Sequence, residues 1–279
     1  MKILLTGRTG QVGWELERTL QALGEVIATD RTTLDLADAD AIQKKLKEVK
    51  PGIIVNAAAY TAVDQAESEP QLAMQVNGVA PGVLAEEAKR LGALLVHYST
   101  DYVFDGSKPS PYLETDVPNP LSAYGRAKLS GERAVQASGC RHLILRTSWV
   151  YGPRGRNFYR TIAAKAAAGE RLRVVDDQRG VPTTGRFLAE ETIALLQKDA
   201  SGLLHLVPSG ETTWYGFAQE ILRQTGSSAN LEPIETSEFK TAARRPANSV
   251  LDNRKAAAVL GRPLPDWQSL LVRCAREAL

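Results

Sequence analysis

The sequence predicts an α/β protein with a Rossmann-type doubly wound parallel sheet and a smaller C-terminal α/β substrate lobe. Short apolar runs alternate with amphipathic helical segments up to residue 147, and a glycine-rich turn follows the first run. Strands that alternate with helices indicate parallel crossover connections, in which ligands bind at the carboxyl ends of the strands. After Trp149 the alternation loosens, which indicates a second unit.

The elements of the first unit follow one another in a regular order. We expect strands at residues 2–6, 25–29, 53–56, 93–98 and 142–146, and helices at residues 10–23, 39–49, 71–91 and 122–137. Further helices at about 157–168, 186–196, 214–225 and 266–277 are separated by turns that contain Pro and Gly. The sequence therefore predicts a Rossmann domain over residues 1–150 and a substrate-binding lobe over residues 151–279, interleaved with the last strands of the sheet.

The composition argues against several classes of protein. The 279 residues are 43% hydrophobic and 24% charged, with a net charge of +2 and no basic stripe that would favour nucleic acid. No apolar run approaches the ~18 residues that a membrane-spanning helix needs. Cys140 and Cys274 lie far apart, which argues against a disulfide framework or a thiolate metal site. We expect a cytoplasmic protein without nucleic-acid or membrane partners.

The turn after the first strand has the spacing of a dinucleotide-binding loop. Gly7 permits a tight turn, Gly10 lets the backbone approach a phosphate, and Gly13 allows the helix to pack closely on the strand. Gln11 and Val12 lie between them at the helix start, where free N–H groups face an anion. We therefore expect these five residues to hold the pyrophosphate of NAD(P).

The charges near the end of the second strand leave the choice of cofactor open. Asp30 is placed to accept hydrogen bonds from the adenosine ribose, which favours NADH. Arg31 adjoins it and Arg8 lies in the glycine loop, and either guanidinium could hold the 2′-phosphate of NADPH. We expect NADPH to serve, with NADH also possible.

Three residues form a candidate catalytic set. Tyr124 and Lys128 are four residues apart on an expected helix, so both project from one face. A lysine cation one turn away favours the phenolate and would lower the pKa of Tyr124 from its ordinary value near ~10. Thr100 ends the fourth strand, beside that helix, where its hydroxyl could polarise the carbonyl that Tyr124 protonates. Because a Tyr and a Lys at this spacing are a weak signal alone, the prediction depends on their order behind the glycine loop.

These residues resemble the extended short-chain dehydrogenase/reductases and, within them, the dTDP-4-dehydrorhamnose reductase family. The resemblance covers nearly the whole chain through six motifs: GQVG (10–13), NAAAYTAVD (56–64), STDYVFDG (99–106), RTSWVY (146–151), DQRGVPT (177–183) and RPANS (245–249). It implies hydride transfer from NAD(P)H to the C4 ketone of dTDP-4-dehydro-L-rhamnose. It also implies that Tyr124 donates the proton, that Lys128 binds the nicotinamide ribose, and that Thr100 contacts the substrate carbonyl.

The same resemblance implies further contacts. Asp101 and Trp149 would contact the sugar nucleotide, and Asp35 and Leu36 would flank the adenine. Residues Ala58, Ala59, Tyr60 and Thr61 would line the cofactor cleft. Each has a simpler alternative: Asp35 could cap the following helix, Trp149 could be a core aromatic, and the segment after the third strand could be a turn.

A metal-linked dimer is doubtful. Some members of the family hold Mg²⁺ at a dimer contact through glutamates, and Glu15 matches the first of these. Arg186 stands where the next carboxylate is expected, and Glu190 and Glu191 come a helical turn later. Since Mg²⁺ needs clustered oxygen ligands, we expect no metal and a monomer or a weak homodimer.

Two other classes stay open at this stage. A dehydratase would carry a second carboxylate directly after Asp101, but Tyr102 stands there, which argues strongly against dehydration. The same residue argues less strongly against a related nucleotide-sugar epimerase. A non-catalytic NADP-binding regulatory subunit, similar to the β-subunit of methionine adenosyltransferase, would keep much of the same motif set.

Overall fold

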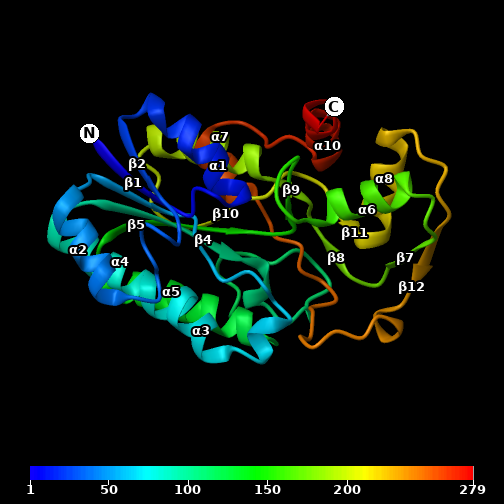
Figure 1. Ribbon diagram of the computed structural model, residues 1–279, viewed down its shortest axis with the longest axis horizontal. Helices are drawn as coiled ribbons and strands as arrows, with labels where there is room; N and C mark the ends of the chain where they lie inside the picture. The colour runs from blue at the N-terminus through cyan, green and yellow to red at the C-terminus, as the bar shows by residue number, and fades with distance from the viewer. Residues whose placement is uncertain (279) are drawn as a thin grey trace.

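The structure, a computed structural model that describes residues 1–278, is built on a six-stranded parallel sheet in the order β2-β1-β3-β4-β5-β10 (Figure 1). Its strands are β1 (Lys2–Thr6), β2 (Glu25–Thr29), β3 (Ile53–Asn56), β4 (Leu94–Thr100), β5 (Arg141–Thr147) and β10 (Gly202–His205). The strand order reverses beside β1, which is the position where doubly wound sheets bind ligands. The predicted fold class is confirmed.

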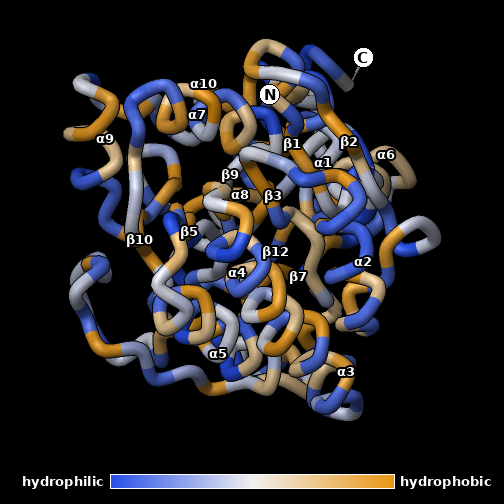
Figure 2. Tube along the Cα trace, turned by 90° about the vertical axis from the view of Figure 1, so that its left-hand side faces the viewer, coloured by the Kyte–Doolittle hydropathy of each residue, from blue (hydrophilic) through white to orange (hydrophobic). Residues whose placement is uncertain are grey.

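Helices cover both faces of this sheet because successive strand residues point to opposite sides. On β1, Ile3 and Leu5 join one apolar cluster and Leu4 joins another. Figure 1 shows α2, α4 and α5 below the sheet and α1 and α7 above it, and Figure 2 shows hydrophobic residues along β1 and β3. These helices are α1 (Gln11–Thr19), α2 (Ala39–Val49), α4 (Ala80–Leu91), α5 (Ala123–Ser138) and α7 (Gly185–Gln197).

A second group of elements lies at the carboxyl end of the sheet, on the right of Figure 1. Strand β7 (Leu172–Val175) pairs with β12 (Leu231–Ile234), β8 (Arg179–Gly180) with β11 (Thr212–Thr213), and β6 (Val150–Tyr151) with β9 (Thr183–Thr184). Its helices are α6 (Phe158–Ala167) and α8 (Trp214–Thr225), while α9 (Arg254–Leu260) and α10 (Trp267–Ala278) end the chain. Between these elements the chain returns to the large sheet as α7 and β10.

The helix expected at residues 71–91 is interrupted. It consists of α3 (Pro70–Met74), a π-helical turn (Gln75–Val79) and α4. Pro81 lacks the N–H that would bond the carbonyl of Asn77, so the ladder is broken there. That carbonyl instead faces Gly131 on α5, where a Cβ would lie only 2.2 Å from it. The interruption therefore lets α5 approach closely.

Smaller departures concern the ends of elements. The first helix ends at Thr19 and continues as a 3-10 turn (Leu20–Ala22), and β4 extends to Thr100. Further 3-10 turns lie at Gln65–Glu67, Asp101–Val103 and Thr236–Glu238. Cys140 and Cys274 are both buried free thiols. Within residues 1–278, no helix has the length and apolar character required to cross a bilayer.

Candidate active site

The glycine loop forms a close-packed cradle at the end of β1. Gly7 has a φ of 77°, and a Cβ there would lie 2.7 Å from the nitrogen of Ala58. A Cβ on Gly13 would lie 2.0 Å from the carbonyl oxygen of Gly7. Gly10 precedes α1 and has no side chain to cap the first N–H groups of that helix. This backbone therefore fits the pyrophosphate of a dinucleotide, since an anion can satisfy those N–H groups.

A cleft opens beside this cradle. Of the predicted cofactor residues, it is lined by Gly7, Asp30, Asp35, Leu36, Ala58, Ala59 and Tyr60. Thr61 is exposed and is not among its lining residues. The cleft also contains Arg31, Leu34, Leu72 and Val76, so its walls combine apolar surface for a base with charge for a ribose or phosphate.

Gln11 and Val12 lie at the start of α1, where they could reach a bound pyrophosphate only through their backbone. The Gln11 side chain accepts a hydrogen bond from Nδ2 of Asn157 at 2.7 Å and donates to the carbonyl of Val150 at 3.3 Å. The Val12 side chain packs against the core above the sheet. Both side chains therefore face protein rather than the adenosine cleft.

The carboxylate of Asp30 is partly committed to its own turn. Its Oδ1 accepts hydrogen bonds from the backbone and hydroxyl groups of Thr32 and Thr33, at 2.7 to 3.1 Å. These bonds, led by the Thr32 hydroxyl, lower the pKa of Asp30, so the group is charged near neutrality. Ribose hydroxyls would therefore bond to the other oxygen, Oδ2.

The two arginines that compete for a 2′-phosphate differ in their surroundings. Arg8 donates from Nη2 and Nε to Glu17 at 2.6 and 3.2 Å, so its guanidinium is already paired. The Arg31 side chain is 79% exposed and has only a 3.8 Å contact with Asp35. Because Arg31 also lines the cleft with Asp30, it is the better placed of the two.

Asp35 does not cap the following helix, which is capped instead by Asp38 through a 3.0 Å bond from the nitrogen of Ala41. The carboxylate of Asp35 accepts from the nitrogen of Ala37 at 2.9 Å and lies at the cleft. Leu36 is 5% exposed and belongs to the core below the sheet, so it presents only an edge to the cleft.

Lys128 and Tyr124 project from α5 toward the end of β4. The Lys128 ammonium is buried and donates to the carbonyl oxygen of Tyr98 at 2.6 Å. Burial lowers the pKa of Lys128 to about 8, although Glu132 opposes this shift. Burial also raises the pKa of Tyr124 to about 12, against a hydrogen bond with Thr100 that lowers it. The expectation that Lys128 brings the phenol toward neutral pH is wrong in this structure, because desolvation is the larger effect.

Thr100 links the phenol to a buried carboxylate. Its hydroxyl donates to Oδ1 of Asp101 at 2.9 Å and accepts from the nitrogen of Tyr102 at 3.2 Å. The hydroxyl hydrogen is thus directed at Asp101, and Thr100 also lies within hydrogen-bonding reach of the Tyr124 phenol. Burial raises the pKa of Asp101 to about 6, although the hydroxyls of Ser249 and Thr100 oppose this shift. Among the described residues, none makes a hydrogen bond of good geometry to the Oδ2 of Asp101. A buried acceptor without a partner fits a hydroxyl group of a ligand.

Trp149 is held by unusual local geometry rather than in an ordinary core. Its φ is 45°, in the left-handed region that a bulky residue rarely adopts. Its ring stacks on Trp214 with centroids 3.6 Å apart and planes 9° from parallel. A Cβ on Gly180 would lie 2.4 Å from the same indole, so only glycine fits there. Such strain, together with partial exposure, is typical of residues that contact ligands.

Sequence reasoning missed the residues that join the C-terminal segment to the site. Arg245 donates to both oxygens of Asp64 at 2.8 and 3.2 Å. Asn248 donates from Nδ2 to the carbonyl of Lys108 at 2.7 Å. Both partners lie about 140 to 180 residues away along the chain. The RPANS motif was the signal available, but its partners depend on the tertiary fold.

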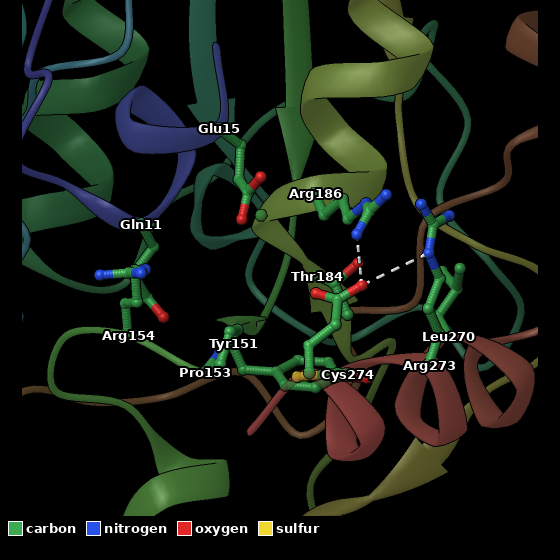
Figure 3. A pocket seen from close by; sticks show the side chains of 13 residues that line it. Gln11, Glu15, Tyr151, Pro153, Arg154, Thr184, Arg186, Leu270, Arg273 and Cys274 are labelled. Atoms are coloured by element: carbon green, nitrogen blue, oxygen red, sulfur yellow. Dashed lines mark hydrogen bonds and ion pairs between the residues drawn. The ribbon is translucent and has the colours of Figure 1, made fainter. Parts of the chain in front are cut away.

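The position where the resemblance suggested a Mg²⁺ site, and where we expect no metal, has arginines beside its carboxylates. Figure 3 shows Glu15 and Arg186 at a hollow where α1, α7 and α10 meet, with dashed lines from Arg186 and Arg273 to one carboxylate. Arg186 donates to Glu277 at 2.5 Å and to Glu190 at 2.9 Å. Arginines therefore already pair with Glu190 and Glu277, two carboxylates that a cation beside Glu15 would need. Within the described part of the chain, no group of three or more His, Cys, Asp or Glu could hold a metal.

The fold and the site together define a class of protein, the short-chain dehydrogenase/reductases. In this class a Tyr and a Lys on one helix lie at the same edge of the sheet as a glycine-lined cradle for a dinucleotide. Comparison with known proteins narrows the class. The model of the RmlD substrate binding domain family matches residues 1–279, and the chain belongs to this family.

Full-length relatives agree. A dTDP-4-dehydrorhamnose reductase of Burkholderia thailandensis is 46% identical over 100% of this chain and 99% of its own. The structure is similar to a dTDP-4-dehydrorhamnose reductase from Clostridium acetobutylicum, with a TM-score of 0.95 and 39% identity over 99% of both chains. It is equally similar, at 34% identity over 99% of both chains, to the Bacillus anthracis reductase, whose crystals contained NADP.

Proposed function

We propose that the protein reduces the C4 ketone of dTDP-4-dehydro-L-rhamnose to give dTDP-L-rhamnose, with NADPH or NADH as cofactor. The observation that carries this proposal is the full-length match to proteins named dTDP-4-dehydrorhamnose reductase. In the same chain, Tyr124, Lys128 and Thr100 meet at one edge of the sheet. A non-catalytic regulatory subunit is not favoured, because relatives 40–46% identical over nearly the whole chain are named as reductases.

Bound NAD(P)H would supply the hydride that forms the new C–H bond at C4. Tyr124 would transfer its phenolic proton to the ketone oxygen as negative charge develops there, which yields the alcohol. A phenol with a raised pKa holds its proton until the substrate oxygen becomes basic. Thr100 would donate a second hydrogen bond to that oxygen after turning its hydroxyl away from Asp101.

Lys128 would act in two ways. Its ammonium lies one helical turn from Tyr124 and would stabilise the phenolate left after proton transfer. When the ribose of the nicotinamide enters, the same group can donate to a ribose hydroxyl while it keeps its bond to Tyr98, because an ammonium carries three donors.

Asp101 and Trp149 would orient the sugar. The free Oδ2 of Asp101 would accept from a pyranose hydroxyl, and the half-buried indole of Trp149 would bound the substrate cleft. Residues 1–150, which include Asp101 and Trp149, would hold most of the cofactor, and the lobe formed by residues 151–279 would complete the substrate side of the cleft. We propose a monomer or weak homodimer, since Glu190 and Glu277 are already paired with Arg186 and would be poor ligands for a metal that joined two copies.

The test is direct. Purified protein mixed with enzymatically prepared dTDP-4-dehydro-L-rhamnose should oxidise NADPH and form dTDP-L-rhamnose, measured by loss of absorbance at the reduced nicotinamide band and by chromatography. Parallel assays with NADH give the cofactor preference. Oxidation of neither cofactor with this sugar would refute the proposed function, and turnover with a different 4-keto-6-deoxy sugar would correct its substrate.

A further inference from the structure

A buried ion pair lies beneath the helix that carries the candidate catalytic residues. Tyr124, Lys128 and Glu132 are spaced four residues apart on α5, so they form one row along its inner face. The Glu132 side chain is 1% exposed, and that of its partner Arg146 is 3% exposed. The third member of the row is therefore a fully buried carboxylate that lies outside the cleft.

Glu132 joins α5 to two central strands at once. Arg146 donates from Nε to Oε1 at 2.9 Å and from Nη2 to Oε2 at 2.6 Å. The hydroxyl of Ser99 donates to the same Oε1. Ser99 and Arg146 are paired residues of β4 and β5, and the next pair in the register contains Thr100. The carboxylate is thus anchored one residue before the candidate catalytic threonine.

Stability alone does not account for this arrangement. The attraction within a buried ion pair is largely offset by the loss of hydration of both charges, and apolar residues of similar volume often stabilise a core equally well. Glu132 has a second effect, however, because its charge opposes the decrease that burial causes in the pKa of Lys128. The pair therefore acts on the lysine as well as on the packing of the helix.

We infer that Glu132 is a positioning residue for the reduction: held by Arg146 and Ser99, it fixes α5 so that Lys128 reaches the carbonyl of Tyr98, and it keeps the lysine ammonium charged. This inference rests on the proposed function. It gives Glu132 a role in the reaction, although this buried carboxylate would contact neither the substrate nor the cofactor.

Other groups near Lys128 do not take over this task. His97 on β4 is buried, and burial together with the charge of Lys128 holds its pKa well below the ordinary value, so it stays neutral. Tyr124 on the same helix carries no charge near neutrality. The phenol of Tyr98 bonds the hydroxyl of Thr192 at 2.6 Å, away from the ammonium. Glu132 is the charged group that raises the pKa of Lys128.

The variant Glu132→Gln keeps the size and an acceptor oxygen but removes the charge. The titration of Lys128 should be followed by NMR of ¹³Cε-labelled lysine and identified by its absence in Lys128→Met. We expect the Lys128 midpoint to move lower by about one pH unit, because the variant removes the negative charge that favours the ammonium. One unit corresponds to about a tenfold change in the protonation equilibrium. The alkaline limit of kcat should move in the same direction, because the charged ammonium is the active form.

Glu191→Gln is the matched control. Glu191 is a buried carboxylate on α7 that pairs with Arg262 at 2.6 and 2.8 Å. Its loss should lower the thermal midpoint and leave both the Lys128 titration and the pH profile unchanged. If Glu132→Gln does not fold, Glu132→Leu combined with Arg146→Met removes both buried charges at similar volume. The Lys128 midpoint should then still move lower, but by less, because the opposing cation of Arg146 is removed as well.

Two results would overturn the inference: an unchanged Lys128 midpoint in the folded variant, or a loss of kcat of equal size at every pH. The NMR titration needs no substrate. If the wild-type protein fails to reduce the keto-sugar, the proposed function is refuted while the effect of Glu132 on Lys128 is still measured.

Discussion

The ammonium of Lys128 lies 2.6 Å from the carbonyl oxygen of Tyr98, on the strand that ends at Thr100. This bond fixes the lysine to the sheet rather than to Tyr124, although the two residues share a helical face. The backbone of β4 thus determines where the ammonium lies relative to the end of the strand. One strand thereby positions both the lysine and the threonine of the candidate catalytic set.

We expect Lys128→Met to reduce kcat by 10²-fold or more and to weaken cofactor binding by about tenfold, because one ammonium serves two partners. Fluorescence titration of the cofactor and steady-state kinetics separate the two effects. A defect confined to kcat, with an unaltered Kd for the cofactor, would contradict the ribose role.

The pH dependence of kcat follows from the same residue. Burial lowers the pKa of Lys128 to about 8, and the protonated form is the active one. Activity should therefore hold below this pH and fall as the pH rises through it. A profile that stays flat to pH 10 would show that the charge of Lys128 is not required.

Tyr124→Phe should retain cofactor affinity and lose about 10²–10⁴-fold in kcat, because only the transferable proton is removed. Tyr159→Phe, in the buried core of the smaller lobe, is the control and should keep near-normal kcat. Near-normal turnover in Tyr124→Phe would mean that another group donates the proton.

The cofactor preference depends on Arg31. We expect Arg31→Ala to weaken NADPH by about fivefold, near 1 kcal/mol for an exposed charge pair, and to leave NADH unchanged. Arg8→Ala should have a smaller effect, since Glu17 already pairs its guanidinium. Values of kcat/KM for both cofactors decide between them, and equal losses for NADPH and NADH in Arg31→Ala would remove Arg31 from the phosphate.

Asp30→Ala should weaken NADH more than NADPH. The variant deletes an acceptor for the ribose and relieves repulsion of the 2′-phosphate. Because Oδ1 is bonded within the turn, some loss of local order is also expected, and circular dichroism melting measures it. A loss of NADPH affinity as large as that of NADH would show that Asp30 does not face the ribose.

Asp101→Asn should raise the KM for the keto-sugar by about tenfold with a smaller change in kcat. The amide keeps the volume but offers one acceptor oxygen in place of two, so either Thr100 or the sugar loses its partner. An unchanged KM would place the sugar elsewhere.

Removal of divalent cations should change neither activity nor association. Arg186 and Arg273 supply the positive charge beside Glu15, Glu190 and Glu277. Sedimentation velocity and turnover with EDTA or with millimolar MgCl₂ provide the measurement. Association that requires Mg²⁺ would contradict this reading of the hollow in Figure 3.

The sequence was informative wherever function depends on local backbone chemistry. Gly7, Gly10 and Gly13 follow a buried strand at fixed spacing, and their geometry is set within about ten residues of chain. The row of Tyr124 and Lys128 follows from helical periodicity alone. For the same reason the alternation of strands and helices was enough to predict the doubly wound sheet.

The tertiary structure decided what depends on burial and on distant partners. Spacing suggested that Lys128 would lower the pKa of Tyr124, but desolvation at the sheet edge raises it instead. Asp30 looked free, yet its own turn occupies one oxygen, and Arg8 is paired with Glu17. The roles of Glu132 and Arg245 were not predicted, since Arg146 and Asp64 come beside them only when the chain folds. Local structure follows from backbone geometry and from the periodicity of the sequence. The charge states of buried groups depend instead on how much water folding removes from around them.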